Sequence, residues 1–158
     1  MMPEQNPTDG LFWPYLEPIL RAQPGVNYVQ LSDANGMDRL LEDSRSEEVY
    51  PGIFVMRPRY RGRLVENALQ LAMFEMIAYF FCYADSQQRE DVDAAYRQAE
   101  ATASTVLKKL HTDHRCYANY LDFDSIQMDP VLYTTGSDAA YGYELKLKMG
   151  LPANEIYS

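Results

Sequence analysis

The feature that most constrains the fold is the apolar run LQLAMFEMIAYFFCYAD, residues 69–85, whose interior carries a single carboxylate, Glu75. A helix that crosses a bilayer needs about 20 consecutive apolar residues, and Gln70 and Glu75 interrupt this run, so no membrane span is expected. Read with a period of two, the run places apolar side chains on both faces, which is typical of a strand covered on both sides. We therefore predict a strand. A helix beginning near Val65 is the competing interpretation, because the first half is rich in helix-forming residues.

The composition indicates a globular protein with an acidic surface. Hydrophobic residues make up 47% of the 158 residues, and the formal net charge is −9. This length favours one domain over residues 1–158, in which residues 1–9 and 151–158 are expected to be loose termini. The acidic balance argues against nucleic-acid binding, because phosphate contacts need clustered basic residues. The presence of only two cysteines and the lack of an apolar leader favour the cytoplasm as the location.

Hydrophobic periodicity and turn residues predict the remaining elements. Helices are expected from about residue 8 to residue 23 and over residues 90–110, where small Ala99 and Ala103 would allow close packing on a sheet. The other predicted strands are residues 26–31, residues 49–64 with bends at two prolines, residues 120–135 and residues 139–150. The resulting order, α-β-β-β-α-β-β, implies an α+β fold with a mostly antiparallel sheet of about five strands and two main helices packed on one face.

The stretch HTDHRC is the one local cluster with metal-ligand chemistry. It contains His111, Asp113, His114 and Cys116, and Zn²⁺ accepts all of these side-chain types. The alternative is that the two histidines complement the negative end of the long helix. No second ligand pair accompanies the cluster elsewhere, so these four residues are candidates only, and no metal or cofactor is predicted.

Carboxylates form two further candidates. Asp122 and Asp124 alternate along a predicted strand, so they would share one face, either for acid-base or metal chemistry or as a solvated surface. Glu75 lies in the apolar run, where a carboxylate must be paired or have a raised pKa. We predict that Glu75 is paired with arginines of the preceding segment, where Arg57, Arg59, Arg61 and Arg63 alternate and would share one face.

The stretch RPRYRGR is a basic patch in an acidic chain. We predict that it forms an interface with the acidic surface of a second copy of the chain, in a head-to-tail contact that can close into a ring. Nucleic acid is the less favoured partner, although a basic and aromatic mixture is compatible with it. The candidate interface residues are Arg57, Arg59, Tyr60, Arg61 and Arg63.

The run IAYFFCYAD, the alanine-rich helix after it and the terminal stretch DAAYGYELKLKMG together resemble phage-type tail terminator and neck proteins. In related phage-like elements a tyrosine-glycine pair opens a last alternating strand, as Tyr141 and Gly142 do here. The resemblance covers residues 11–149 and implies an α+β subunit that assembles into a ring closing a tail tube, with no catalytic residues. The polar insert at residues 32–48 departs from this pattern and leaves the ring interface open.

These observations lead to three functional hypotheses. The first is a non-enzymatic structural or assembly protein that binds itself or other structural proteins, in the cytoplasm or in a virion-like particle. The second is a small metal- or ligand-binding enzyme with a site near His111, His114, Asp122 and Asp124. The third is an adaptor domain that binds a protein partner. A deep polar pocket would favour the enzyme, whereas complementary charged or apolar faces would favour assembly.

Overall fold

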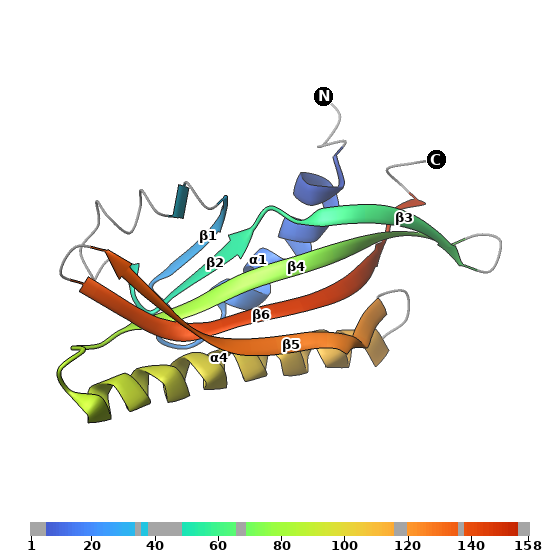
Figure 1. Cartoon of the computed structure of the whole chain (residues 1–158). Helices are drawn as coiled ribbons and strands as arrows, with labels where there is room; N and C mark the ends of the chain where they lie inside the picture. The colour runs from blue at the N-terminus through green and yellow to red at the C-terminus, as the bar shows by residue number, and fades with distance from the viewer. Residues whose placement is uncertain are drawn as a thin grey trace.

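A computed structural model describes residues 6–33, 36–37, 49–65, 69–115, 120–135 and 138–154 of the chain. Among these residues a helical N-terminal segment precedes four strands, a long helix and two final strands (Figure 1). In chain order the elements are the π-helical turn η1 (Thr8–Phe12), α1 (Trp13–Arg21), β1 (Tyr28–Ser32), β2 (Gly52–Met56), β3 (Arg59–Val65), β4 (Leu69–Tyr83), α4 (Arg89–Arg115), β5 (Tyr120–Thr135) and β6 (Asp138–Pro152).

The apolar run is a strand, as its period-two pattern predicted, and it forms β4. Phe74, Met76 and Phe80 lie at alternate positions, are at most 1% exposed and belong to the main core. Successive side chains of a strand point to opposite faces, so residues two apart reach the same core. The competing helix is thereby excluded.

β4 lies inside a six-stranded sheet, counted over the described residues, with the order β1-β2-β4-β6-β5 and with β3 paired to β4 off this path. β1 and β2 run parallel, whereas the other pairs are antiparallel. The α+β class and the two main helices are confirmed. The prediction of a mostly antiparallel sheet of about five strands in the order α-β-β-β-α-β-β is wrong, because the sheet is mixed and has one strand more.

The additional strand arises because residues 49–64 do not form one continuous strand. β2 pairs with residues 78–81 of β4, and β3 pairs with residues 69–75 along the same edge. The break falls at Arg57 and Pro58, where proline has no N–H to donate to a ladder. The N–H of Arg57 instead donates to the carbonyl of Ser32 at 2.9 Å, at the end of the parallel β1–β2 pair. Parallel pairing needs a long connection, and the polar insert after Ser32 provides one.

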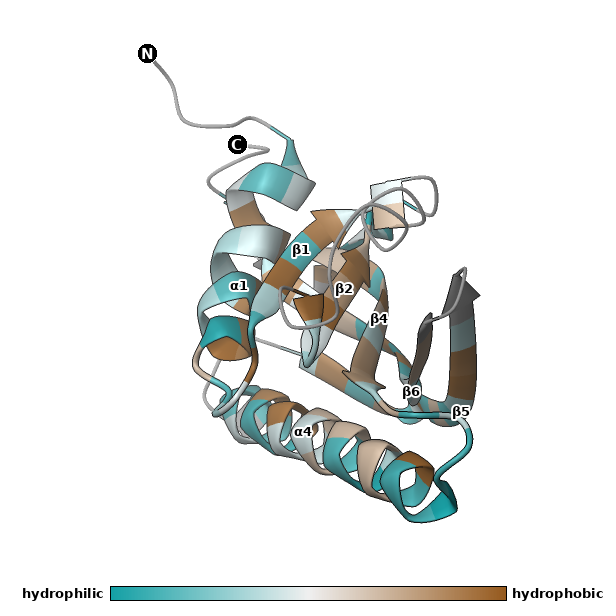
Figure 2. Cartoon of the chain, turned by 90° about the vertical axis from the view of Figure 1, so that its left-hand side faces the viewer, coloured by the Kyte–Doolittle hydropathy of each residue, from teal (hydrophilic) through white to brown (hydrophobic). Residues whose placement is uncertain are grey.

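α1 and α4 pack on the same face of the sheet, since both contribute to one core cluster (Figure 2). The helix predicted over residues 90–110 is confirmed as part of α4, and its apolar residues Ala99, Ala103 and Val106 are at most 1% exposed. The alanines have no bulky side chain to hold the helix away from the strands. We call the opposite side of the sheet, away from α1 and α4, the open face.

A second, smaller core explains why β4 is apolar on both sides. Phe54 and Phe81 lie on the open face and pack against Met37, Val49 and Tyr50. The rings of Phe54 and Phe81 are 6.1 Å apart. Met37 comes from within the polar insert and Val49 and Tyr50 follow it, so these three side chains cover one end of the open face.

The expectation of loose termini is wrong for the residues nearest the domain. Thr8 and Asp9 belong to η1, and Leu151 and Pro152 belong to β6. Ala153 is fully buried, and its N–H donates to the carbonyl of Gln70 at 2.7 Å. Residues 1–5 and 155–158, for which the same expectation was made, lie outside the described residues. Within the described part of the chain, no helix is long and apolar enough to cross a membrane.

Candidate functional site: a charged groove on the open face

The arginines of β3 reach the open face by strand alternation. Arg59, Arg61 and Arg63 stand opposite Glu75, Met73 and Leu71 of β4, respectively. The intervening Tyr60 stands opposite Phe74, and their rings are 5.4 Å apart. The predicted alternation of the arginines is therefore confirmed for these three residues.

The arginines form one wall of a groove with a volume of about 420 Å³. Met73 and Glu75 of β4 and Lys148 of β6 lie between the walls, and Tyr120 and Asp122 of β5 form the opposite wall. The groove thus spans four strands. Its lining residues are Arg59, Tyr60, Arg61, Arg63, Met73, Phe74, Glu75, Tyr120, Asp122 and Lys148.

Glu75 is paired, as predicted, and its partners come from two different strands. Its carboxylate lies 3.4 Å from Nε of Arg59 and 3.7 Å from Nζ of Lys148. The side chain is 41% exposed, so the pairing does not have to offset the cost of full burial. Exposed pairs of this kind contribute about 0–1 kcal/mol each, so we assign Glu75 an electrostatic role in the groove more than a stabilising one.

Register places the ionic side chains in a row that crosses the sheet. Arg59 is opposite Glu75, Glu75 is opposite Lys148, and Lys148 is opposite Asp122. Cross-strand neighbours of opposite charge attract each other, so the row is internally complementary. It begins with a cation on β3 and ends with a carboxylate on β5.

Gly150 leaves the floor of the groove without a side chain near its middle. Gly150 lies opposite Met73 on one side and Tyr120 on the other. A Cβ atom at Gly150 would stand 2.6 Å from the Met73 sulfur and 3.4 Å from Cβ of Tyr120. The guanidinium of Arg63 lies 5.3 Å from the centroid of the ring of Tyr120, the residue opposite Gly150 on β5. This cation-π contact holds Arg63 over the sheet.

Arg57, the remaining candidate interface residue, does not join the groove. It lies between β2 and β3, where its backbone N–H bonds to Ser32. The sequence pattern did not identify Lys148, Tyr120, Met73 or Gly150 as site residues. Lys148 lies on the polar face of an alternating strand, which was the available signal, but only strand pairing brings it beside Glu75.

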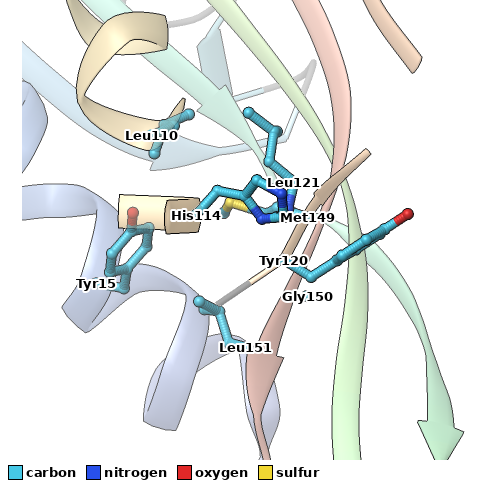
Figure 3. Close-up of a pocket in the computed structure, with 8 residues that line it drawn as sticks. All are labelled: Tyr15, Leu110, His114, Tyr120, Leu121, Met149, Gly150 and Leu151. Carbon is cyan, nitrogen blue, oxygen red and sulfur yellow. The ribbon is translucent and has the colours of Figure 1, made fainter. Parts of the chain in front are cut away.

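The histidine cluster serves to join α4 to its neighbours. Nδ1 of His114 accepts the backbone N–H of Leu121 at 3.0 Å. Figure 3 shows its imidazole between Tyr15 of α1 and Tyr120 of β5, beside a cavity of about 10 Å³. That volume is about the minimum for one water molecule, so the cavity offers no room for a larger ligand. His111 makes an edge contact with Phe123, with ring centroids 5.6 Å apart.

The Asp113 side chain faces α1, so it does not join the histidines as a metal ligand. It accepts a hydrogen bond from the Tyr15 hydroxyl at 2.6 Å and one from Lys109 at 2.9 Å. Cys116 lies outside the described residues. Within the described ranges no group of three His, Cys, Asp or Glu side chains is arranged to hold a metal ion.

Electrostatics around Asp113 give a pH-dependent prediction. Burial alone would raise the pKa of Asp113, but hydrogen bonds from Tyr15 and Lys109 and the Lys109 charge outweigh burial and lower that pKa. Because the pKa of Asp113 is lower in the folded state than in the unfolded state, the ionised carboxylate stabilises the fold. This contribution is fully present above the unfolded-state pKa of about 3.9 and is lost as the pH falls through the folded-state pKa. Tyr15→Phe should therefore lower the free energy of unfolding by about 1–2 kcal/mol at neutral pH. At strongly acidic pH the variant and the original chain should differ less in their free energies of unfolding. Urea unfolding at neutral and at strongly acidic pH measures this difference. The same loss of stability at both pH values would contradict a hydrogen bond to an ionised Asp113.

Asp122 lines the groove, whereas Asp124 is not among the lining residues. The β5–β6 register shifts between Asp122 and Gln127, so strand pairing does not fix the face of Asp124, and its shared face with Asp122 stays a prediction. Ser125 stabilises this bulge: its hydroxyl donates to the Asp122 carbonyl at 2.6 Å and accepts the Lys148 N–H at 2.8 Å. The bulge interrupts the regular pairing of β5 with β6 after Asp122, which the sequence pattern could not reveal.

Two other shifted groups lie on β4. Burial, a hydrogen bond to Glu144 and the charge of Glu144 raise the pKa of Tyr79 to about 12. Burial raises the pKa of the Cys82 thiol to about 11, so this thiol stays protonated at neutral pH and lacks nucleophilic character. Both groups therefore contribute to the sheet in their neutral forms.

No protein-family model and no curated protein matches this chain. The groove and the edges of the sheet are the features of this chain that indicate a function.

Proposed function

We propose that this protein is a non-enzymatic assembly subunit that associates head to tail with copies of itself. The observation that carries the proposal is the separation of charge between two strand edges. β3, RYRGRLV, contains three arginines and no acidic residue, whereas β5, YLDFDSIQMDPVLYTT, contains three aspartates and no lysine or arginine. Among the described strands, β3 pairs only with β4 and β5 only with β6, so each has one edge without a strand partner.

Exposed apolar side chains accompany the charges on both strands. Leu64 of β3 is 65% exposed, and Phe123 and Leu132 of β5 are 64% and 55% exposed. An interface needs apolar area to bury as well as complementary charge for orientation. A contact between two different edges is heterologous, so it repeats from copy to copy and either closes a ring or extends a filament.

Side chains, more than a continuous backbone ladder, would form this contact. Pro130 of β5 has no N–H, and His114 already accepts the N–H of Leu121. Prolines and charged residues on edge strands oppose unrestricted strand pairing. The proposed contact is therefore selective for a complementary charged surface.

The particle that we propose is a phage-derived tail or neck ring, in keeping with the resemblance of residues 11–149 to tail terminator and neck proteins. Other structural proteins of such a particle are the proposed additional partners. The groove residues need no catalytic role in this function.

The test is the mass in solution, measured by light scattering over a range of protein and salt concentrations. We expect the mass to rise with protein concentration and to fall at high salt, because salt screens exposed charges. Arg61→Glu on β3 and Asp129→Lys on β5 should each weaken association by about tenfold or more. Lys108→Glu, a charge reversal on an exposed position of α4, is the matched control. A monomer at every concentration, or full assembly of both edge variants, would refute the proposal.

A further inference from the structure

We infer that the groove on the open face binds an organic diphosphate, through Lys148 and the β3 arginines. This inference concerns a ligand of the single chain and goes beyond the proposed self-association. Four cations line the groove, Arg59, Arg61, Arg63 and Lys148, against the two carboxylates Glu75 and Asp122. The lining is thus net positive in a chain whose formal charge is −9.

The carboxylates do not neutralise the whole groove. Glu75 is shared between Arg59 and Lys148. The side chain of Arg61 makes no hydrogen bond or ion pair with another described residue, and the guanidinium of Arg63 contacts the neutral ring of Tyr120. Two guanidinium groups are therefore available to an anion without breaking an ion pair among the described residues.

The arrangement of donors suits phosphate groups. Guanidinium forks bind phosphate oxygens in a bidentate manner, and an ammonium group adds a point charge. Arg61 and Arg63 project from the same face two residues apart, a spacing of about 7 Å along a strand. Two phosphate groups joined in one ligand can engage both arginines at the same time.

The size and walls of the groove argue for an organic part. A volume of about 420 Å³ lies within the range of small-molecule sites, about 300–1,000 Å³, and exceeds what phosphate groups alone fill. Met73 and Tyr120 supply apolar and aromatic surface beside the cations. The low point at Gly150 leaves this surface accessible, because a Cβ there would push the Met73 thioether upward.

Isothermal titration calorimetry of the full chain with pyrophosphate tests the charged part of the site. We expect saturable binding of one pyrophosphate per chain. Lys148→Gln should weaken it by about tenfold or more, because a charge-assisted contact is lost and Glu75 keeps only one partner. Glu75→Gln should strengthen it, since both Arg59 and Lys148 are released. Lys108→Gln, the same change on α4, should leave the affinity unchanged.

Adenosine diphosphate and Gly150→Ala test the organic part. Adenosine diphosphate should bind more tightly than pyrophosphate, and Gly150→Ala should reduce that advantage by displacing Met73 into the groove. No saturable binding, or equal loss in Lys148→Gln and Lys108→Gln, would overturn the site. Equal affinity for the two ligands would overturn the organic diphosphate. Lys148 and Gly150 lie on β6, inside the sheet, so these two variants change the groove and leave the residues of the β3 and β5 edges intact.

Discussion

Replacing Phe74 with alanine is expected to lower the free energy of unfolding by about 3–5 kcal/mol, the range for a large aromatic side chain removed from a packed core. Phe74 is fully buried at the centre of β4. Its ring lies 5.0 Å from that of Phe12 in η1 and 5.4 Å from that of Tyr60 in β3. The truncation would leave a cavity where three elements meet, and close packing limits how far they can relax.

Phe123→Ala provides the matched control for the Phe74 truncation. It removes the same atoms from a side chain that is 64% exposed, so the free energy of unfolding should change by about 0.5 kcal/mol or less. Chemical denaturation followed by circular dichroism measures both variants. Similar midpoints for the two would show that Phe74 is not the core residue described here.

Gly142→Ala is expected to have the second large effect, a loss of about 3 kcal/mol or more, at the upper end of the cost of overpacking. A Cβ at Gly142 would stand 1.7 Å from the carbonyl oxygen of Phe80 and 2.7 Å from its carbonyl carbon. Both are backbone atoms of the central strand β4, so no rotamer change can relieve the clash. β6 and β4 would have to separate locally, where they pair along nearly their whole length.

Gly62→Ala on β3 is the matched control, because it makes the same substitution in a strand without a steric clash. A Cβ at Gly62 meets no atom within 4 Å, so the substitution should be neutral or stabilising by up to about 1 kcal/mol. Thermal unfolding of the two glycine variants gives the comparison. A Gly142 variant as stable as the Gly62 variant would mean that β4 and β6 are farther apart than the structure has them.

The sequence predicted those helices and strands in which apolar residues recur with a regular period. Alternation along β4 and the stripe of Ala99, Ala103 and Val106 on α4 both follow from backbone geometry, which repeats every two residues in a strand and every 3.6 in a helix. The same alternation placed Arg59, Arg61 and Arg63 on one face, and the apolar surroundings of Glu75 in the sequence indicated that its carboxylate would be paired. Residues 49–64 were predicted as one strand bent at its prolines, whereas the structure divides them at Pro58 into the two strands β2 and β3.

Tertiary structure alone decided which segments meet. The row from Arg59 through Glu75 and Lys148 to Asp122 joins residues far apart in the chain, and its register depends on how β6 packs between β4 and β5. The bulge after Asp122 and the parallel pairing of β1 with β2 are likewise products of whole-sheet packing. A sequence pattern determines which face a side chain takes. Which residue of a neighbouring strand it then faces depends on the register, and the register is set when the apolar faces of all the strands are buried together. The groove therefore exists only in the folded sheet.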